Sequence, residues 1–248
     1  TYAYYWTETL APDGYSFSDG YINEWGVVIV SDSCISSKEQ NPRIVDGGIG
    51  YGIRRLMAER SKTAREAVGV AIDLLNKYGY RHGGRSYQIS DKDEVWVLQV
   101  VRSNHYVAKR LPSDQVFVMA NAYNIRDVNL NDKNNVIASP DLITYAIDQG
   151  WYKPAVAGNY SDFDFAAAYQ PDDIRSADFN RQRHRNALKM LMGKEYEFLK
   201  FPFSVKPDHK VTVDEVKKIL SSHNEGTADF NDKHEGFHYS MNTVCNID

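Results

Sequence analysis

The strongest constraint on the fold is a series of short strand-like runs separated by very short polar breaks. Residues 86–90, 95–101, 106–110 and 116–119 are rich in β-branched, aromatic and other apolar side chains. The breaks between them contain Asp-Lys-Asp-Glu, Ser-Asn and Pro-Ser-Asp. A connection between parallel strands needs about a dozen residues or more, so breaks this short are hairpin turns. The sequence therefore predicts an antiparallel meander.

Helical patterns lie before and after this meander. The clearest is Ala64–Tyr78, which Thr63 and Glu66 open with a capping-box pattern and Gly79 closes. Its apolar residues recur at spacings of three and four, which places them on one face. Together with the strands, these helices predict an α+β fold. The remaining expected elements are a strand at 2–6, a turn-rich stretch at 11–20, a strand at 27–31, a helix ending at Arg60, a helix at 139–149 opened by Ser139-Pro140, and helices near 180–198 and 213–222.

Composition excludes several classes of protein. The chain has 248 residues, 42% of them hydrophobic, and no Pro/Gly-rich linker divides it, so we expect a single domain over residues 1–248. With 29 basic and 33 acidic residues and no basic block, it is not expected to bind nucleic acid. No apolar run approaches the roughly 20 residues of a membrane-spanning helix. The two cysteines, Cys34 and Cys245, are too few for a disulfide framework and leave the compartment open.

One short motif matches a metal site. His234-Glu235-Gly236-Phe237-His238 has the spacing of the zinc-peptidase pattern, in which both histidines must lie on one face of a helix. Its surroundings contain glycine, aspartate and asparagine without an apolar stripe, and the chain continues for only ten more residues. We therefore interpret it as a solvated loop, expect no metal or other cofactor, and keep a zinc peptidase as the alternative function.

Two further features have a simple and a chemical interpretation. Cys34 follows a predicted strand, and a cysteine nucleophile needs a base such as histidine, but a small buried thiol is the simpler interpretation. Residues 181–185 hold three arginines at the start of a helical pattern. Such a run is usually a solvated face, although one arginine could turn inward to bind a carboxylate with its planar fork.

Eight longer strings form an ordered series that covers nearly the whole chain. The strings are Gly20–Val27, Asp46–Ile49, Glu59–Ala67, Lys77–Tyr80, Asp91–Trp96, Ala120–Ile125, Ser139–Ile143 and Ser221–Thr227. Each string alone is a weak signal. In this order and spacing, the strings together resemble the dipeptidase D family of N-terminal-nucleophile (Ntn) hydrolases, which are related to the eukaryotic secernins.

The resemblance implies a fold, an activity and three site residues. The implied fold is an αββα sandwich of two antiparallel sheets flanked by helices. The implied activity is hydrolysis of dipeptides or similar small amides by an N-terminal Cys, whose own α-amine acts as the base. Asn121 would donate its side-chain N–H to the oxyanion, Ser33 would supply a backbone N–H, and Arg181 is the favoured member of the arginine cluster. The substrate-binding residues are not indicated.

The family's nucleophile should lie some tens of residues before Thr1, so we expect the chain to lack the nucleophile segment and a late C-terminal strand. Thr1 itself resembles part of an internal family strand and is not expected to be the nucleophile. A non-catalytic scaffold with the same fold is a further alternative. The implied partner is a small peptide, the implied origin is bacterial, and a homo-oligomer or association with the rest of its own chain stays open.

Overall fold

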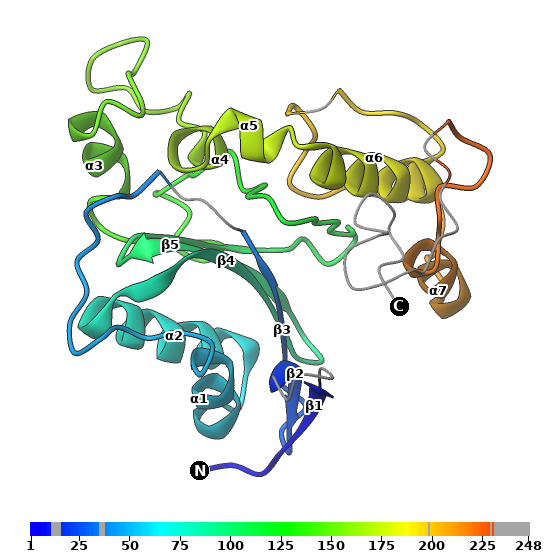
Figure 1. Ribbon diagram of the computed structural model, residues 1–248, viewed down its shortest axis with the longest axis horizontal. Coiled ribbons are helices and arrows are strands. Elements are labelled where there is room, and N and C mark those ends of the chain that lie inside the picture. Colours follow the sequence, from blue (N-terminus) through cyan, green and yellow to red (C-terminus); the bar gives the residue numbers. More distant parts are fainter. Residues whose placement is uncertain (11–15, 35–37, 198, 229, 231–248) are drawn as a thin grey trace. The chain divides into compact units, whose positions relative to one another are not determined.

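A computed structural model of the protein describes residues 1–10, 16–34, 38–197, 199–228 and 230 (Figure 1). These residues form two compact units. The first consists of Thr1–Ser113 and Ile125–Pro171, and the second of Asp114–Asn124 and the described residues from Asp172 onward. Each unit is described below by itself, and the single-domain interpretation stays a prediction.

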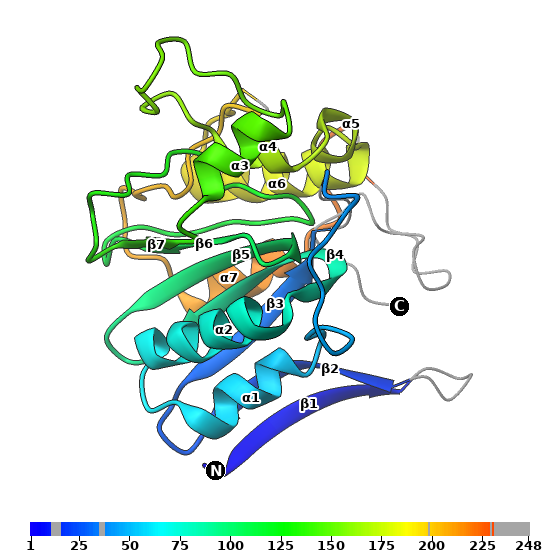
Figure 2. The same ribbon diagram turned by 90° about the vertical axis from the view of Figure 1, so that its left-hand side faces the viewer.

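The first unit is built on a seven-stranded sheet in which the strands lie side by side in chain order, and every neighbouring pair is antiparallel (Figure 2). This confirms the predicted α+β class and the antiparallel meander. The strands are β1 (Tyr4–Leu10), β2 (Ser16–Asn23), β3 (Val28–Ser33), β4 (Tyr80–Ser90), β5 (Val95–Ser103), β6 (Tyr106–Arg110) and β7 (Val136–Ala138).

Two helices, α1 (Ile53–Arg60) and α2 (Ala64–Tyr78), cover one face of this sheet (Figure 2). The core between these helices and the sheet contains Trp96, Leu98 and Val100, which alternate along β5. The residues between these, such as Val97 and Gln99, are also fully buried. Because both faces of β5 are covered, its sequence has a continuous apolar run rather than a strict alternation.

The predicted helix of residues 64–78 has the predicted bounds. The Thr63 hydroxyl accepts a hydrogen bond from the Glu66 N–H at 3.1 Å, as a capping box requires. The Glu66 carboxylate accepts from the Lys62 N–H at 2.7 Å instead of from Thr63, so the helix start has one half of the capping box. At the other end, the Gly79 N–H donates to the Leu75 carbonyl at 2.8 Å.

Two segments differ from the sequence-based expectation. Residues 116–119 were expected to be a strand, but Val116 forms only an isolated bridge with Val205 in the second unit. The edge of the sheet beside β6 is instead occupied by β7, which pairs Ala138 with Val107. In the stretch of residues 11–20, which was expected to be turn-rich, the part from Ser16 onward belongs to β2.

Two short helices, α3 (Leu142–Asp148) and α4 (Phe165–Tyr169), complete the first unit. The α3 helix begins two residues later than Pro140, the expected first helical residue. The Ser139 hydroxyl, expected to cap the helix, accepts a hydrogen bond from the Tyr106 N–H at 3.4 Å, and the Ser139 carbonyl accepts from the Leu142 N–H at 3.1 Å. The serine therefore connects the helix start to the end of the sheet.

The second unit contains α5 (Asp172–Arg175), α6 (Asp178–Met192) and α7 (Val213–Leu220), so the helices expected near 180–198 and 213–222 are present with shifted bounds (Figure 1). Its apolar core consists of Leu188 and Leu191 of α6 together with Phe201 and Val205. No helix among the described residues of either unit is long and apolar enough to cross a membrane.

A buried histidine joins this core to residues 114–124. The ring centres of His184 and Phe201 lie 3.9 Å apart, and the Nε2 atom of His184 is 3.1 Å from the Val118 carbonyl oxygen. Burial lowers the pKa of His184 to about 4, and the bond to Val118 only partly opposes this. The ring is therefore neutral at pH 7, and its one N–H must lie on Nε2 to donate to the carbonyl.

Glycines at the middle and the end of α2 should respond oppositely to alanine. At Gly69 an added Cβ meets no atom within 4 Å, so Gly69→Ala should raise the free energy of unfolding by about 0.5–1 kcal/mol. Gly79 has φ +73°, and its Cβ would lie 2.2 Å from the Arg43 carbonyl oxygen. Gly79→Ala should therefore lower the free energy of unfolding by more than about 1–3 kcal/mol, the cost of the backbone conformation alone. Urea unfolding of both variants measures this, and similar effects at the two sites would contradict the described end of α2.

His184 should make the protein sensitive to acid. Its pKa in the folded state lies below the ordinary value of 6.5, so between pH 6.5 and pH 4 unfolding takes up a proton. The contribution of the neutral His184 ring to the free energy of unfolding is complete above pH 6.5. It declines by about 3 kcal/mol in all as the pH falls to 4. Glutamine can still donate to the Val118 carbonyl but does not titrate. The free energy of unfolding of His184→Gln should therefore fall less steeply between pH 7 and pH 4.5, and parallel curves would refute the buried neutral ring.

Candidate active site

The candidate site in the second unit is the segment of residues 118–124, which has no regular secondary structure and contains Asn121. The helix α6 lies against this segment through Asn180, Arg183 and His184. Spacings of three and four place these three residues on one face of the helix. The same face continues toward the end of the helix as Ala187, Leu188 and Leu191, which are buried. This face of α6 is therefore polar in its first half and apolar in its second.

Side-chain donors from α6 and from the segment itself bind two of the segment's carbonyl groups, those of Val118 and Asn121. The Asn180 side chain donates to the Asn121 carbonyl at 3.3 Å and to the Ile174 carbonyl at 2.9 Å. The Val118 carbonyl accepts from the Asn124 side chain at 3.1 Å as well as from His184. Buried carbonyl groups outside helices and sheets need such partners. These bonds therefore hold the backbone in place at Val118 and at Asn121.

The side chain of Asn121 is held by Arg183. The Nη2 atom of Arg183 donates to Oδ1 of Asn121 at 2.6 Å, and its Nε atom donates to the Phe179 carbonyl of the same helix at 2.6 Å. A guanidinium has only donors, so the amide atom that faces it must be the oxygen. The nitrogen of the Asn121 amide consequently lies on the side away from this bond.

Arg181, the arginine favoured from the sequence, makes a different contact. Its Nη2 atom lies 2.5 Å from Oδ1 of Asp178, three residues earlier on α6, and about a third of its side chain is exposed. Two residues correspond to roughly 200° around a helix, so Arg181 and Arg183 point to nearly opposite sides. The structure places Arg183 against Asn121. Tracing the apolar positions Leu191 and Ala187 back by four residues would have indicated Arg183.

Ser33 lies in the first unit, whereas Asn121 and Arg181 lie in the second. It is the last residue of β3, opposite Arg85 of β4, and it is half-buried. The strand expected at residues 27–31 therefore extends to Ser33, which lies at its end. The next N–H, that of Cys34, donates to the Gly84 carbonyl at 3.3 Å, so the pairing with β4 extends just past Ser33.

Cys34 is a buried thiol, as the simpler interpretation of the sequence predicts. Its Sγ atom lies 3.2 Å from the hydroxyl of Ser86, which also accepts a hydrogen bond from the Gln99 side chain at 2.9 Å. Burial raises the pKa of Cys34 to about 12, although the bond to Ser86 favours the thiolate. A nucleophile needs the thiolate, so at neutral pH this environment makes Cys34 unreactive.

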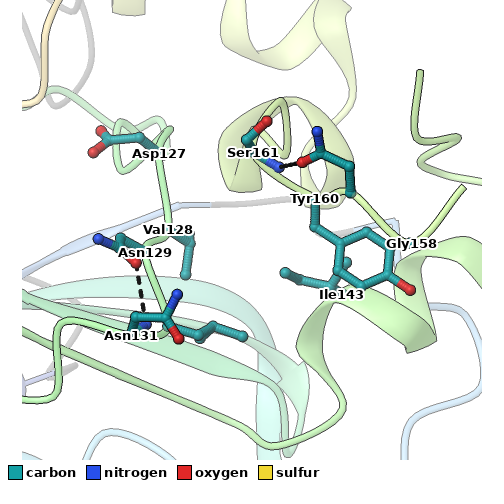
Figure 3. A pocket seen from close by; sticks show the side chains of 10 residues that line it. Asp127, Val128, Asn129, Asn131, Ile143, Gly158, Tyr160 and Ser161 are labelled. Atoms are coloured by element: carbon teal, nitrogen blue, oxygen red, sulfur yellow. Dashed lines mark hydrogen bonds between the residues drawn. The ribbon is translucent and has the colours of Figure 1, made fainter. Parts of the chain in front are cut away.

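A pocket of about 650 Å³ lies in the first unit between the loops 127–131 and 158–161 (Figure 3). Ile143 of α3 and Tyr160 contribute apolar surface, and the asparagines of both loops contribute amide groups. Asn129 and Asn159 each accept a hydrogen bond from the N–H two residues ahead, at 3.1 and 3.0 Å, which fixes the loops. The volume suits a small ligand. Sequence reasoning missed the pocket because asparagine- and glycine-rich loops have the composition of ordinary turns.

The zinc-peptidase motif of His234, Glu235 and His238 lies outside the described residues. Within the part of the chain that the structure describes, no three His, Cys, Asp or Glu side chains gather where they could hold a metal ion.

Comparisons with known proteins agree with the resemblance seen in the sequence. A probable dipeptidase from Latilactobacillus sakei is 28% identical over an alignment of 223 residues that covers 85% of this chain and 45% of the relative. A probable dipeptidase from Salmonella dublin is 30% identical over an alignment of 196 residues that covers 76% of this chain and 43% of the relative. A probable dipeptidase B from Lactococcus lactis is 30% identical over an alignment of 216 residues that covers 83% of this chain and 44% of the relative. The chain therefore spans about half the length of these curated relatives.

A family model provides the broadest match. The model described as peptidase family C69 matches residues 20–243, which is nearly the whole chain. This confirms the resemblance to the Ntn-type dipeptidases: the chain belongs to peptidase family C69.

Proposed function

We propose that the protein is a dipeptidase, or a hydrolase of similar small amides, that acts through an N-terminal cysteine carried upstream of Thr1. The observation that carries the proposal is the match of peptidase family C69 over residues 20–243. The names of the relatives, probable dipeptidase and probable dipeptidase B, support the same substrate class. The αββα sandwich that the resemblance implies is part of this proposal.

In the proposed reaction, the cysteine thiol gives its proton to its own α-amine, whose ordinary pKa is near 8. The sulfur forms a bond to the carbonyl carbon of the substrate, and the electron pair of the C=O bond moves to the oxygen. The oxyanion then collapses, the C–N bond breaks, and the leaving amine takes the proton from the α-amine. Water hydrolyses the thioester that remains and regenerates the thiol.

Asn121 is proposed to stabilise the oxyanion through its Nδ2–H group. A neutral amide is suited to this role because it donates at every pH without a change of protonation state. The bond from Arg183 to Oδ1 supports the role, since it directs the nitrogen away from α6. The backbone N–H of Ser33 is proposed as a second donor. For the arginine of the site, the contact with Asn121 favours Arg183 over Arg181.

Loss of the Asn121 amide should reduce turnover strongly. Removing one oxyanion donor typically costs roughly 3 kcal/mol of transition-state stabilisation, which is about a hundredfold or more in rate. We expect Asn121→Ala in the full-length protein to lower kcat by about this factor, with a small change in KM and in the midpoint of thermal unfolding. Asn134→Ala, at an exposed asparagine, is the matched control. Full activity of Asn121→Ala would remove this residue from the mechanism.

Thiol and metal reagents should separate the proposal from the zinc alternative. Alkylation with iodoacetamide should abolish dipeptide hydrolysis, and mass spectrometry should locate the label on the N-terminal residue of the mature protein. Cys34 should stay unlabelled in the folded protein, because its pKa is raised to about 12. Activity should survive a strong chelator such as 1,10-phenanthroline. Loss of activity on chelation, restored by zinc, or an N-terminal residue other than cysteine, would reject the cysteine mechanism.

A further inference from the structure

We infer that Arg183 is a positioning residue that fixes the orientation of the Asn121 side-chain amide. This inference rests on the proposed function, in which the Nδ2 end of that amide donates to the oxyanion. It adds a residue that acts through Asn121 and not on the substrate itself. The contacts that carry it all lie within the second unit, between α6 and the segment of residues 118–124.

The guanidinium of Arg183 is fixed by contacts with its own helix as well as by its bond to Asn121. Its Nε atom donates to the Phe179 carbonyl at 2.6 Å, and the guanidinium carbon lies 5.8 Å from the centre of the Phe179 ring. Phe179 is one turn earlier on the same helix, so the guanidinium is anchored to α6. From this position Nη2 donates to Oδ1 of Asn121 at 2.6 Å, and the positive charge on the donor makes this a charge-assisted hydrogen bond.

The bond distinguishes the two ends of the amide. An asparagine side chain turned by 180° occupies nearly the same space, but its NH₂ and carbonyl groups exchange places. Turning Asn121 would place NH₂ donors against the N–H donors of Arg183, and a charge-assisted bond would be lost. Arg183 is always protonated, so the preference for the orientation with Oδ1 toward α6 is present at every working pH.

The backbone of Asn121 is fixed by the same helix. Asn180, which is buried and lies three residues before Arg183, donates to the Asn121 carbonyl at 3.3 Å. One turn of α6 therefore holds both the main chain and the side chain of Asn121. An oxyanion donor is effective when it is oriented before the reaction starts, so this double attachment is a preorganising device.

The test measures hydrolysis of alanylalanine by the full-length enzyme. We expect Arg183→Gln to lower kcat by about 10–100-fold while KM changes by less than about threefold. Arg183→Lys, which retains a donor charge without the planar fork, should recover part of that loss. Lys189→Gln is the matched control on the same helix, since the exposed Lys189 pairs with Glu195 at 3.0 Å, and it should stay close to the native rate. An unchanged kcat in Arg183→Gln would overturn the inference.

A double-mutant cycle separates positioning from a merely structural role. If Arg183 acts through the Asn121 amide, Arg183→Gln should slow an enzyme that already carries Asn121→Ala by less than about twofold. The full loss from Arg183→Gln in that background would overturn the inference. If Arg183→Gln does not fold, Arg183→Met, which keeps the apolar stem, replaces it in the same cycle.

The two proposals fail in different ways. Full activity of Asn121→Ala would reject the oxyanion role and this inference with it. A slow Asn121→Ala beside a fully active and folded Arg183→Gln would reject the inference alone and leave the proposed function standing.

Discussion

The candidate site depends on the pairing of α6 with a segment that has no regular structure of its own. Such a segment can present a side chain accurately only if its carbonyl groups have fixed partners. Here Asn180, His184 and Asn124 supply neutral donors to the carbonyls of Asn121 and Val118. Burying a neutral donor costs much less than burying a charge, so the segment can be held tightly at a moderate cost.

The two halves of the buried face of α6 have different roles. Toward its C-terminal end, Leu188 and Leu191 pack with Phe201 and Val205 and stabilise the unit. Toward its N-terminal end, Asn180 and Arg183 contact Asn121. Substitutions in the apolar half should therefore act mainly on folding, whereas the proposed role of Arg183 is to set the geometry of the site. His184 lies between the two halves, because it both packs on Phe201 and binds the Val118 carbonyl.

The sequence predicted those features that local interactions determine. Helix α2 was predicted with its bounds, because a cap, a helical period and a closing glycine agree over residues 63–79. Residues 116–119 have the composition of a strand, yet their place at the sheet edge is taken by β7, a choice that depends on distant parts of the chain. Asn121 was indicated by resemblance, and its role stays a prediction. The contact between Arg183 and Asn121 depends on the helical register of α6, which the charge run alone does not give.

The proposed roles of the cysteine with its α-amine, of Asn121 and of Arg183 also determine how the reaction responds to pH. An asparagine amide and an arginine keep the same protonation state throughout the working range of an enzyme, so the donor and the residue that orients it are constant. Cys34 shows how strongly a sheet interior suppresses thiolate formation, since burial raises its pKa to about 12. A cysteine nucleophile therefore needs a solvated position beside a base, and a chain terminus offers both together, because the α-amine is part of the same residue. In this mechanism the pH dependence of hydrolysis belongs to that amine and thiol, whereas the amide of Asn121 and the guanidinium of Arg183 keep a constant charge state.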